Sequence, residues 1–238
     1  MSLVVQGPAG AAADAEQAGL PPGDGERFAG YGVMGLPFVS GHVLALRRFP
    51  ASSIGPGYTS VWHRDPGGRW VFWQDQRDDE SCARYFSNDV SETRTTAIEV
   101  GWPDDSTLRV AVGEVGLVWT SHLASTRVTR ALNGVGRVMP DRLWRSPPVL
   151  RVMGPVAGFA LRAGTVAMAG TSPNGQRFLA NPQRVWVIDE ARASLGDDGL
   201  GPVGPLPEQA RLGDFRIPQR GVFAIGRTFF DPPVPGDG

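Results

Sequence analysis

The side chains able to exchange protons are few, and they lie near the ends of predicted strands. His63 and His122 each end a strand, where an imidazole can act as an acid or base near neutral pH. Glu99 lies between apolar residues, and a carboxyl group enclosed by apolar surface has a raised pKa and can donate a proton. Tyr85 adds a phenol beside Arg84. Our candidate catalytic residues are therefore Glu99, His122, Tyr85 and His63.

Each of these candidates also has a purely structural interpretation. A histidine at a strand end is commonly solvated or bonded to the backbone, and Glu99 on an outward face is a solvated strand residue. In a strand, Arg84 and Tyr85 point to opposite faces, so only one of them faces the interior. An inward Arg84 would bind a carboxylate or phosphate, whereas an outward Arg84 is a solvated charge.

Tryptophans alternate along three predicted strands and are the candidate walls of a pocket. Trp62 shares a strand face with Tyr58 and Ser60, whereas Trp73 and Trp119 lie on two other strands. Aromatic walls suit a polyene or aromatic guest, and they also fit ordinary core packing.

An apolar, arginine-rich segment spans residues 126–161, with six arginines and one acid, Asp141. Its apolar residues recur every three to four positions, which predicts short amphipathic helices broken by prolines. Arginine forks suit carboxylates and phosphates, so Arg142 and Arg145 join the three tryptophans and Arg84 as candidate ligand-binding residues. A solvated helix face is the alternative.

Composition excludes several kinds of chemistry. The chain has no lysine, which removes Schiff-base catalysis and P-loop nucleotide binding. One cysteine, Cys82, allows no internal disulfide or multi-cysteine metal site, and the three histidines are widely spaced. We predict no metal and no cofactor. The net charge of −1 gives no overall field for binding nucleic acid.

The elements that position these residues are short strands joined by turns. With 32 glycines and 21 prolines in 238 residues, the chain favours turns over long helices. Strands are predicted from residue 42 onward, and Cys82–Phe86 is predicted as one of them. Asp65–Gly68 and Ser172–Gly175 have the residue types of hairpin turns.

These features predict an all-β fold: a lipocalin-like antiparallel β-barrel with a short helical insertion. The single barrel domain covers residues 27–230, with the insertion at 126–161. Residues 1–26 and 231–238 are predicted to be disordered tails. The first residues lack the basic start of a signal peptide, and no run of apolar residues is long enough for a membrane span, so a cytoplasmic protein is expected.

Three segments carry a resemblance to a known group. The Trp-rich hairpin TSVWHRDPGGRWVFWQ, SPNGQRF before RVWVID, and LGDFRIPQRGVFAIG near the end resemble lipocalin-like bacterial proteins of the AttH and carotenoid hydratase (hydroxyneurosporene synthase) type. The resemblance implies a hydrophobic ligand inside a barrel, in some members with water addition to a polyene or its cyclisation. Those relatives usually have two such halves in a longer chain, and no catalytic residue is carried over from them.

The leading hypothesis is a cofactor-independent enzyme that encloses a polyketide-like or isoprenoid-like substrate and catalyses cyclisation, isomerisation or hydration. The alternative is a non-catalytic carrier of lipid or pigment. Acid–base groups inside the pocket would favour the enzyme, and an apolar interior the carrier. The expected partner is a hydrophobic small molecule. A membrane surface is a lesser alternative through the 126–161 segment, and the oligomeric state is left open.

Overall fold

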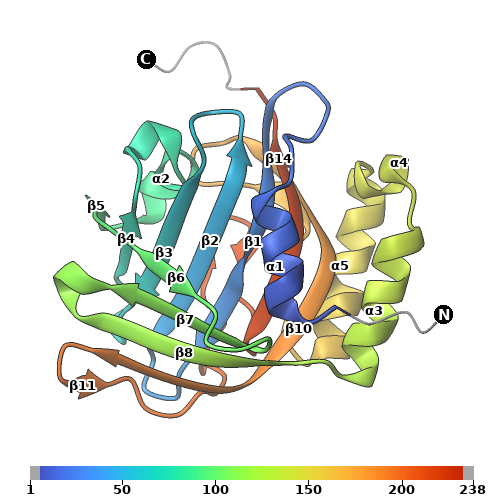
Figure 1. Cartoon of the computed structure of the whole chain (residues 1–238). Coiled ribbons are helices and arrows are strands. Elements are labelled where there is room, and N and C mark those ends of the chain that lie inside the picture. The colour runs from blue at the N-terminus through green and yellow to red at the C-terminus, as the bar shows by residue number, and fades with distance from the viewer. Residues whose placement is uncertain (1–5, 233–238) are drawn as a thin grey trace.

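The computed structural model describes residues 6–232 and consists mainly of one large sheet (Figure 1). Ten strands follow one another in the order β5-β4-β3-β2-β1-β14-β10-β8-β7-β6, and β9 and β11 pair with β10. All neighbours are antiparallel except β4 and β5. The strands of the path are β1 (Glu26–Pro37), β2 (Val43–Ser52), β3 (Tyr58–Arg64), β4 (Trp70–Gln74), β5 (Glu92–Thr95), β6 (Glu99–Gly101), β7 (Thr107–Val112), β8 (Leu117–Ala124), β10 (Arg177–Leu195) and β14 (Val222–Phe230).

The remaining elements are short strands and helices. The strands are β9 (Ala169–Thr171), β11 (Asp198–Gly199) and the separate pair β12 (Arg211–Leu212) and β13 (Phe215–Arg216). The helices are α1 (Pro8–Glu16), α2 (Ala83–Phe86), α3 (Arg127–Val138), α4 (Asp141–Trp144) and α5 (Pro147–Leu161). The last three fall in the segment predicted as a helical insertion, between β8 and β9.

The sheet is strongly curled into an open half-barrel. One core cluster joins Leu46 and Val61 of β2 and β3 to Val110 and Trp119 of β7 and β8, although these strands are far apart in the strand order. The sheet must therefore fold over on itself, and this cluster marks its concave face. The described edge strands β5 and β6 do not pair, so the closed barrel expected from the sequence is not formed.

The concave face is filled by α1, which lies across β1 and β2 in Figure 1. Ala11, Ala12 and Ala15 are buried in the core cluster. Glu16 at the helix end accepts hydrogen bonds from Arg48 and Tyr31. The prediction of a disordered tail over 1–26 is therefore wrong for this segment, while residues 1–5, and 233–238 of the other predicted tail, lie outside the described residues.

The opposite, convex face carries an aromatic cluster. Strand alternation directs Phe28, Tyr58, Trp62, Phe72, Phe178 and Phe230 to this side. Short helix α2 and the β12–β13 hairpin cover one part of this cluster, because Tyr85, Phe86, Leu212 and Phe215 belong to it.

Helices α3–α5 cover another part of the convex face, beside β10 (Figure 1). Thr126 begins α3 with a reciprocal capping box to Thr129, whose backbone N–H it accepts at 3.1 Å. Asn133 exchanges two hydrogen bonds with the backbone of Val185, next to a bulge in β10. These contacts fix the helices over the sheet.

Local structure differs from expectation at Cys82–Phe86. The segment was predicted as a strand, and the structure has a turn into α2. Both turn predictions are confirmed: Asp65–Gly68 joins β3 to β4, and Ser172–Gly175 joins β9 to β10. Within residues 6–232, none of the helices is both long and apolar enough to cross a membrane.

Candidate functional site

A cavity of about 370 Å³ lies between the convex face of the sheet and helices α3–α5. Its volume falls within the range of small-molecule pockets, about 300–1,000 Å³. Strands β1, β2, β3, β10 and β14 supply one wall, and Leu132, Met153 and Ala157 of the helices supply the other. The lining is predominantly apolar and aromatic. The cavity therefore lies on the outer side of the half-barrel, whereas the sequence predicted a pocket inside a barrel.

One charged side chain is buried in this lining. Arg47 of β2 is 5% exposed and shares its strand face with Val43, Ala45 and Phe49. Its Nη1 donates hydrogen bonds to the carbonyl oxygens of Val33 and Leu46, at 2.6 and 2.8 Å. A longer bond, 3.3 Å, runs from Nη2 to the carbonyl of Met34. The pairing of β1 with β2 is irregular here. The guanidinium forms its hydrogen bonds with backbone carbonyl groups in this irregular part of the sheet.

Arg47 has no ion pair with a carboxylate among the described residues. Burial lowers the pKa of its guanidinium to about 10, so the group still carries its charge at neutral pH. A buried charge without a counter-ion is costly, and proteins normally pair such a group or hydrogen-bond it fully. The three carbonyls hold the guanidinium in place but do not neutralise it.

Aromatic rings surround the Arg47 guanidinium. Its Cζ atom lies 4.4 Å from the ring centroid of Trp62 and 5.2 Å from that of Phe215. The Trp62 ring is itself stacked on Phe72, with centroids 4.5 Å apart. Cation–π attraction partly compensates the desolvation of the guanidinium and fixes its plane.

Two further polar groups lie at this end of the cavity. The Tyr58 hydroxyl is 3.3 Å from the Cys82 sulfur, and both residues are fully buried in the lining. Burial raises the pKa of the Cys82 thiol to about 11 and that of Tyr58 well above its usual value. Both groups are therefore protonated at neutral pH, and with Arg47 they form a cluster of donors that suits an anion.

Two other polar atoms of buried lining residues have no hydrogen-bond partner within residues 6–232. They are the Oδ1 atom of Asn181 on β10 and the indole Nε1 of Trp144 in α4. Buried polar atoms without partners are uncommon in folded proteins, and ligand sites are one of the places where they occur.

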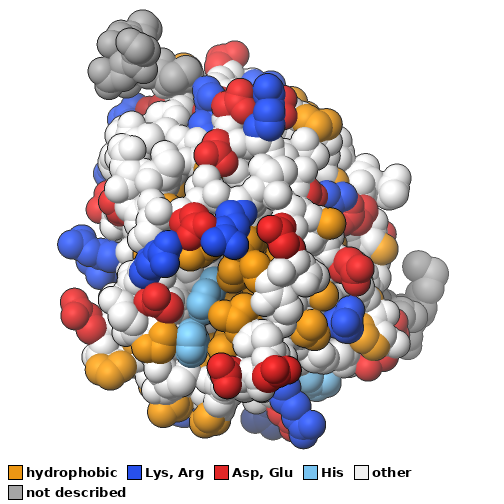
Figure 2. All heavy atoms as spheres, turned by 90° about the vertical axis from the view of Figure 1, so that its left-hand side faces the viewer, with side chains coloured by type: hydrophobic (Ala, Val, Ile, Leu, Met, Phe, Trp, Pro, Cys, Tyr) orange, Lys and Arg blue, Asp and Glu red, His pale blue; other side chains and the backbone are white. Residues whose placement is uncertain are grey.

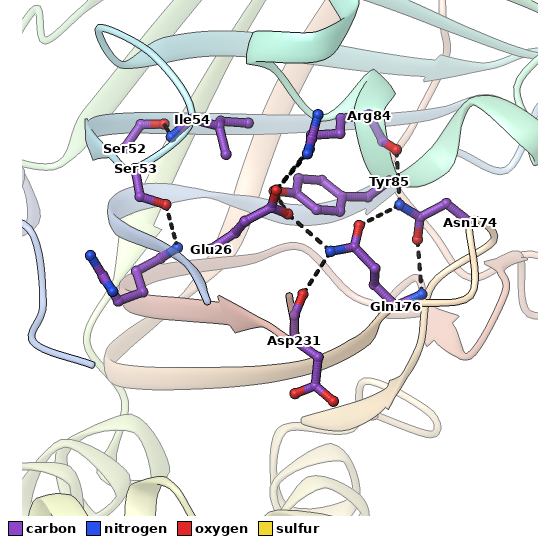
Figure 3. Close-up of polar contacts among 10 residues, drawn as sticks. Glu26, Ser52, Ser53, Ile54, Arg84, Tyr85, Asn174, Gln176 and Asp231 are labelled. Atoms are coloured by element: carbon purple, nitrogen blue, oxygen red, sulfur yellow. Dashed lines mark hydrogen bonds and ion pairs between the residues drawn. The ribbon is translucent and has the colours of Figure 1, made fainter. Parts of the chain in front are cut away.

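A polar network beside the cavity organises α2 (Figure 3). The buried carboxylate of Glu26 accepts bonds from Arg84, from the Tyr85 hydroxyl at 2.7 Å, and from Gln176 at 3.0 Å. Asn174 continues the network from the β9–β10 turn to the backbone of Arg84. These contacts tie α2 to β1 and β10.

Of the predicted ligand-binding residues, Trp62 lines the cavity and Arg84 does not. Arg84 and Tyr85 were expected on opposite faces, but in helical α2 both reach Glu26. Tyr85 also lines the cavity, and its ring stacks on Phe230 with centroids 3.7 Å apart. Burial, together with the hydrogen bond that the phenol donates to Glu26, raises the pKa of Tyr85.

Three predicted site residues lie on the concave face instead. Trp73 and Trp119 are buried in the core cluster. His63 is buried too, with its Nε2 atom 2.9 Å from Nδ1 of His42 and its ring stacked on Trp73. Burial lowers the pKa of His63 to about 4, so its imidazole is neutral at neutral pH. Figure 2 shows histidine side chains beside hydrophobic ones on the side of the molecule where β3–β5 lie.

The other predicted site residues are exposed, and none of them lines the cavity. Glu99 lies exposed on the edge strand β6, 3.8 Å from Arg109, and apolar side chains do not enclose it. His122 on β8 lies 2.7 Å from Asp189. Arg142 is exposed on α4, and Arg145 bonds the carbonyl of Pro22 and lies over the Phe229 ring.

Sequence reasoning missed Arg47, Tyr58 and Cys82 as site residues. A signal for Arg47 exists: in the strand HVLALRRF, the residues on its face are otherwise apolar. Tyr58 and Cys82 meet only through the tertiary fold. No cluster of three or more metal-binding side chains occurs within residues 6–232.

Comparison with known proteins gives no assignment, because no family model and no curated protein matches the chain.

Proposed function

We propose that the protein binds a hydrophobic small molecule that carries a carboxylate or a similar anion. The anion would bind Arg47 and Tyr58, and the apolar body would extend along the cavity towards α3–α5. The observation that carries this proposal is the buried Arg47 guanidinium, which faces a largely apolar cavity without a carboxylate partner. A ligand anion would supply the missing counter-charge, and charge-assisted hydrogen bonds are among the strongest in proteins.

The same lining favours binding over acid–base catalysis. None of the described residues lining the cavity is a histidine, an aspartate or a glutamate. The thiol and phenols present have raised pKa values, so they stay protonated near neutral pH and are not available as general bases. We therefore place the carrier of a lipid or pigment ahead of a cyclase, isomerase or hydratase. The resemblance to lipocalin-like bacterial proteins enters this proposal only through the class of ligand, which is a hydrophobic small molecule.

The test compares each acid with its matching alcohol by isothermal titration calorimetry, using dodecanoic acid with dodecanol and retinoic acid with retinol. We expect the wild-type protein to bind at least one acid about tenfold or more tightly than its alcohol, as one charge-assisted hydrogen bond allows. Arg47→Met should remove this preference. Arg48→Met is the matched control, because Arg48 is the next residue on β2 but lies on the opposite face.

Equal affinity of acid and alcohol in the wild-type protein, or no binding of either pair, would contradict the proposal. Solvent extraction after incubation separates the two functional classes. Recovery of the unchanged acid supports a carrier, whereas a cyclised, isomerised or hydrated product supports the enzyme.

A further inference from the structure

Exposed apolar side chains are concentrated on the helices that cover the cavity. Of the nine large hydrophobic residues exposed among the described residues, seven lie between residues 128 and 159. Phe159 is 87% exposed, and Val138 and Val152 are 77% and 67% exposed. A concentration of this kind on one part of a surface marks a docking site.

The exposed face of α5 is a continuous apolar stripe. Val152, Val156 and Phe159 are spaced by four and three residues, so they lie on one side of the helix. The opposite side, with Leu150 and Leu161, is buried against the rest of the protein. Helix α5 is therefore apolar on both sides.

This stripe is continuous with the cavity. Val152 and Val156 of α5, and Val135 of α3, line the cavity and are also 51–67% exposed. The cavity thus opens to the surface between α3 and α5, and these three valines lie at its mouth.

Charge is segregated onto the same segment. Residues 127–162 contain seven arginines and one acid, Asp141, and therefore carry a net charge of +6. The whole chain has a net charge of −1, so the other residues carry −7. All seven arginines are exposed: Arg127, Arg130, Arg137, Arg142, Arg145, Arg151 and Arg162.

We propose that helices α3 and α5 dock on an anionic lipid bilayer, with the mouth of the cavity facing the membrane. Exposed apolar side chains would enter the interface, while the arginines would bind lipid phosphates. Charge favours this occupant over a second copy of the chain, because a symmetric dimer through this face would bring two arginine clusters together. Exchange of a hydrophobic ligand with the bilayer rests on the proposed function, but docking itself requires no ligand.

The test is co-sedimentation with vesicles, which need contain no fatty acid. Vesicles of phosphatidylcholine with phosphatidylglycerol are compared with phosphatidylcholine alone at low and high salt. We expect the wild-type protein to bind the anionic vesicles, and high salt to weaken this binding. Phe159→Asp should reduce the partition coefficient at least tenfold. Arg137→Glu and Arg151→Glu should each reduce it about fivefold or more.

Matched controls lie elsewhere on the surface. Val39→Asp changes another exposed apolar residue, and Arg211→Glu reverses another exposed arginine; both should bind vesicles like the wild-type protein. Arg47→Met should also bind normally, because Arg47 is buried, so a failure of ligand binding is distinguishable from a failure of docking. Wild-type protein that ignores anionic vesicles, or Phe159→Asp that binds them fully, would overturn the proposal. So would a dimer in analytical ultracentrifugation that Phe159→Asp dissociates.

Discussion

Two neighbouring arginines show how strand alternation sets the chemistry of a residue. Arg48 points to the concave face and pairs with Glu16 at 2.9 Å, and that hydrogen bond raises its pKa. Arg47 points to the convex face, where burial lowers its pKa to about 10. Identical side chains on one strand therefore have different surroundings. Arg48 pairs with Glu16 of α1, whereas Arg47 places its charge in the lining of the cavity.

His63 makes stability depend on pH. Its pKa is lowered from about 6.5 in the unfolded chain to about 4 in the folded protein, chiefly by burial. Between these values the unfolded chain binds more protons, so stability is full above pH 6.5 and falls as the pH drops towards 4. The loss should reach at most about 3 kcal/mol. Urea unfolding of wild type and His63→Asn across this range measures it as the difference between the two pH profiles.

His122 is the matched control, because its shift has the opposite sign. The hydrogen bond with Asp189 raises the pKa of His122, so its contribution is present below about pH 6.5 and is lost as the pH rises through the raised value. His122→Asn should therefore lower stability more at acid than at alkaline pH. Parallel pH profiles for wild type and His63→Asn would contradict the burial of His63.

Helix α1 is a structural part of the fold. Three of its alanines are buried in the concave core, and Glu16 bonds both Arg48 and Tyr31. Removing residues 1–17 should lower the free energy of unfolding by about 3 kcal/mol or more, because charge-assisted bonds and apolar contacts are lost together. Chemical denaturation checks this against a chain that starts at residue 6. Equal stability of the two chains would show that α1 is dispensable.

Strand β1 and helix α1 were not predicted from the sequence, and the cause lies in their local composition. Strand β1 is rich in glycine and gives a weak strand signal, yet β2 requires those glycines. A Cβ atom on Gly30 or Gly32 would lie 2.0 Å from a carbonyl oxygen of β2. Helix α1 is built mainly from alanines, whose small side chains fit a narrow gap under the curled sheet. The same composition is typical of a disordered linker, so the helix was not predicted. The turns and the insertion carry explicit signals: Asn-Gly, Pro-Gly-Gly and apolar residues at helical spacing.

The site itself was only partly accessible to sequence reasoning. Trp62 and Tyr85 were identified because aromatic and phenolic side chains are conspicuous in a strand pattern. Which face of each strand holds the cavity is a tertiary property, and it separates Trp62 from Trp73 and Trp119. The sequence predicted an apolar pocket, and the structure has a largely apolar cavity. The anion site stays a prediction, and the arginine that we propose for it is Arg47 on β2, not one of the insertion.

The large sheet separates two environments within the protein. The concave face is filled by α1 and a packed core, so it has little room for a guest. The convex face is covered by α2, the β12–β13 hairpin and the three helices, and the cavity lies beneath this covering. A curled sheet of this kind provides rigid support for one cavity wall while short helices form the other.

The open half-barrel predicts an uneven pattern of amide hydrogen exchange. Strands β1, β14 and β10 lie in the middle of the strand order and are paired on both sides, whereas β5 and β6 are short edge strands, each paired on one side. Amides such as those of Tyr31 and Ile225 should exchange only through global unfolding, while those of Thr93 and Val100 should exchange through local opening, orders of magnitude faster. Hydrogen exchange followed by NMR measures both groups in one sample. Equal protection at the edges and in the centre would mean that β5 and β6 are covered in solution, as the closed barrel requires.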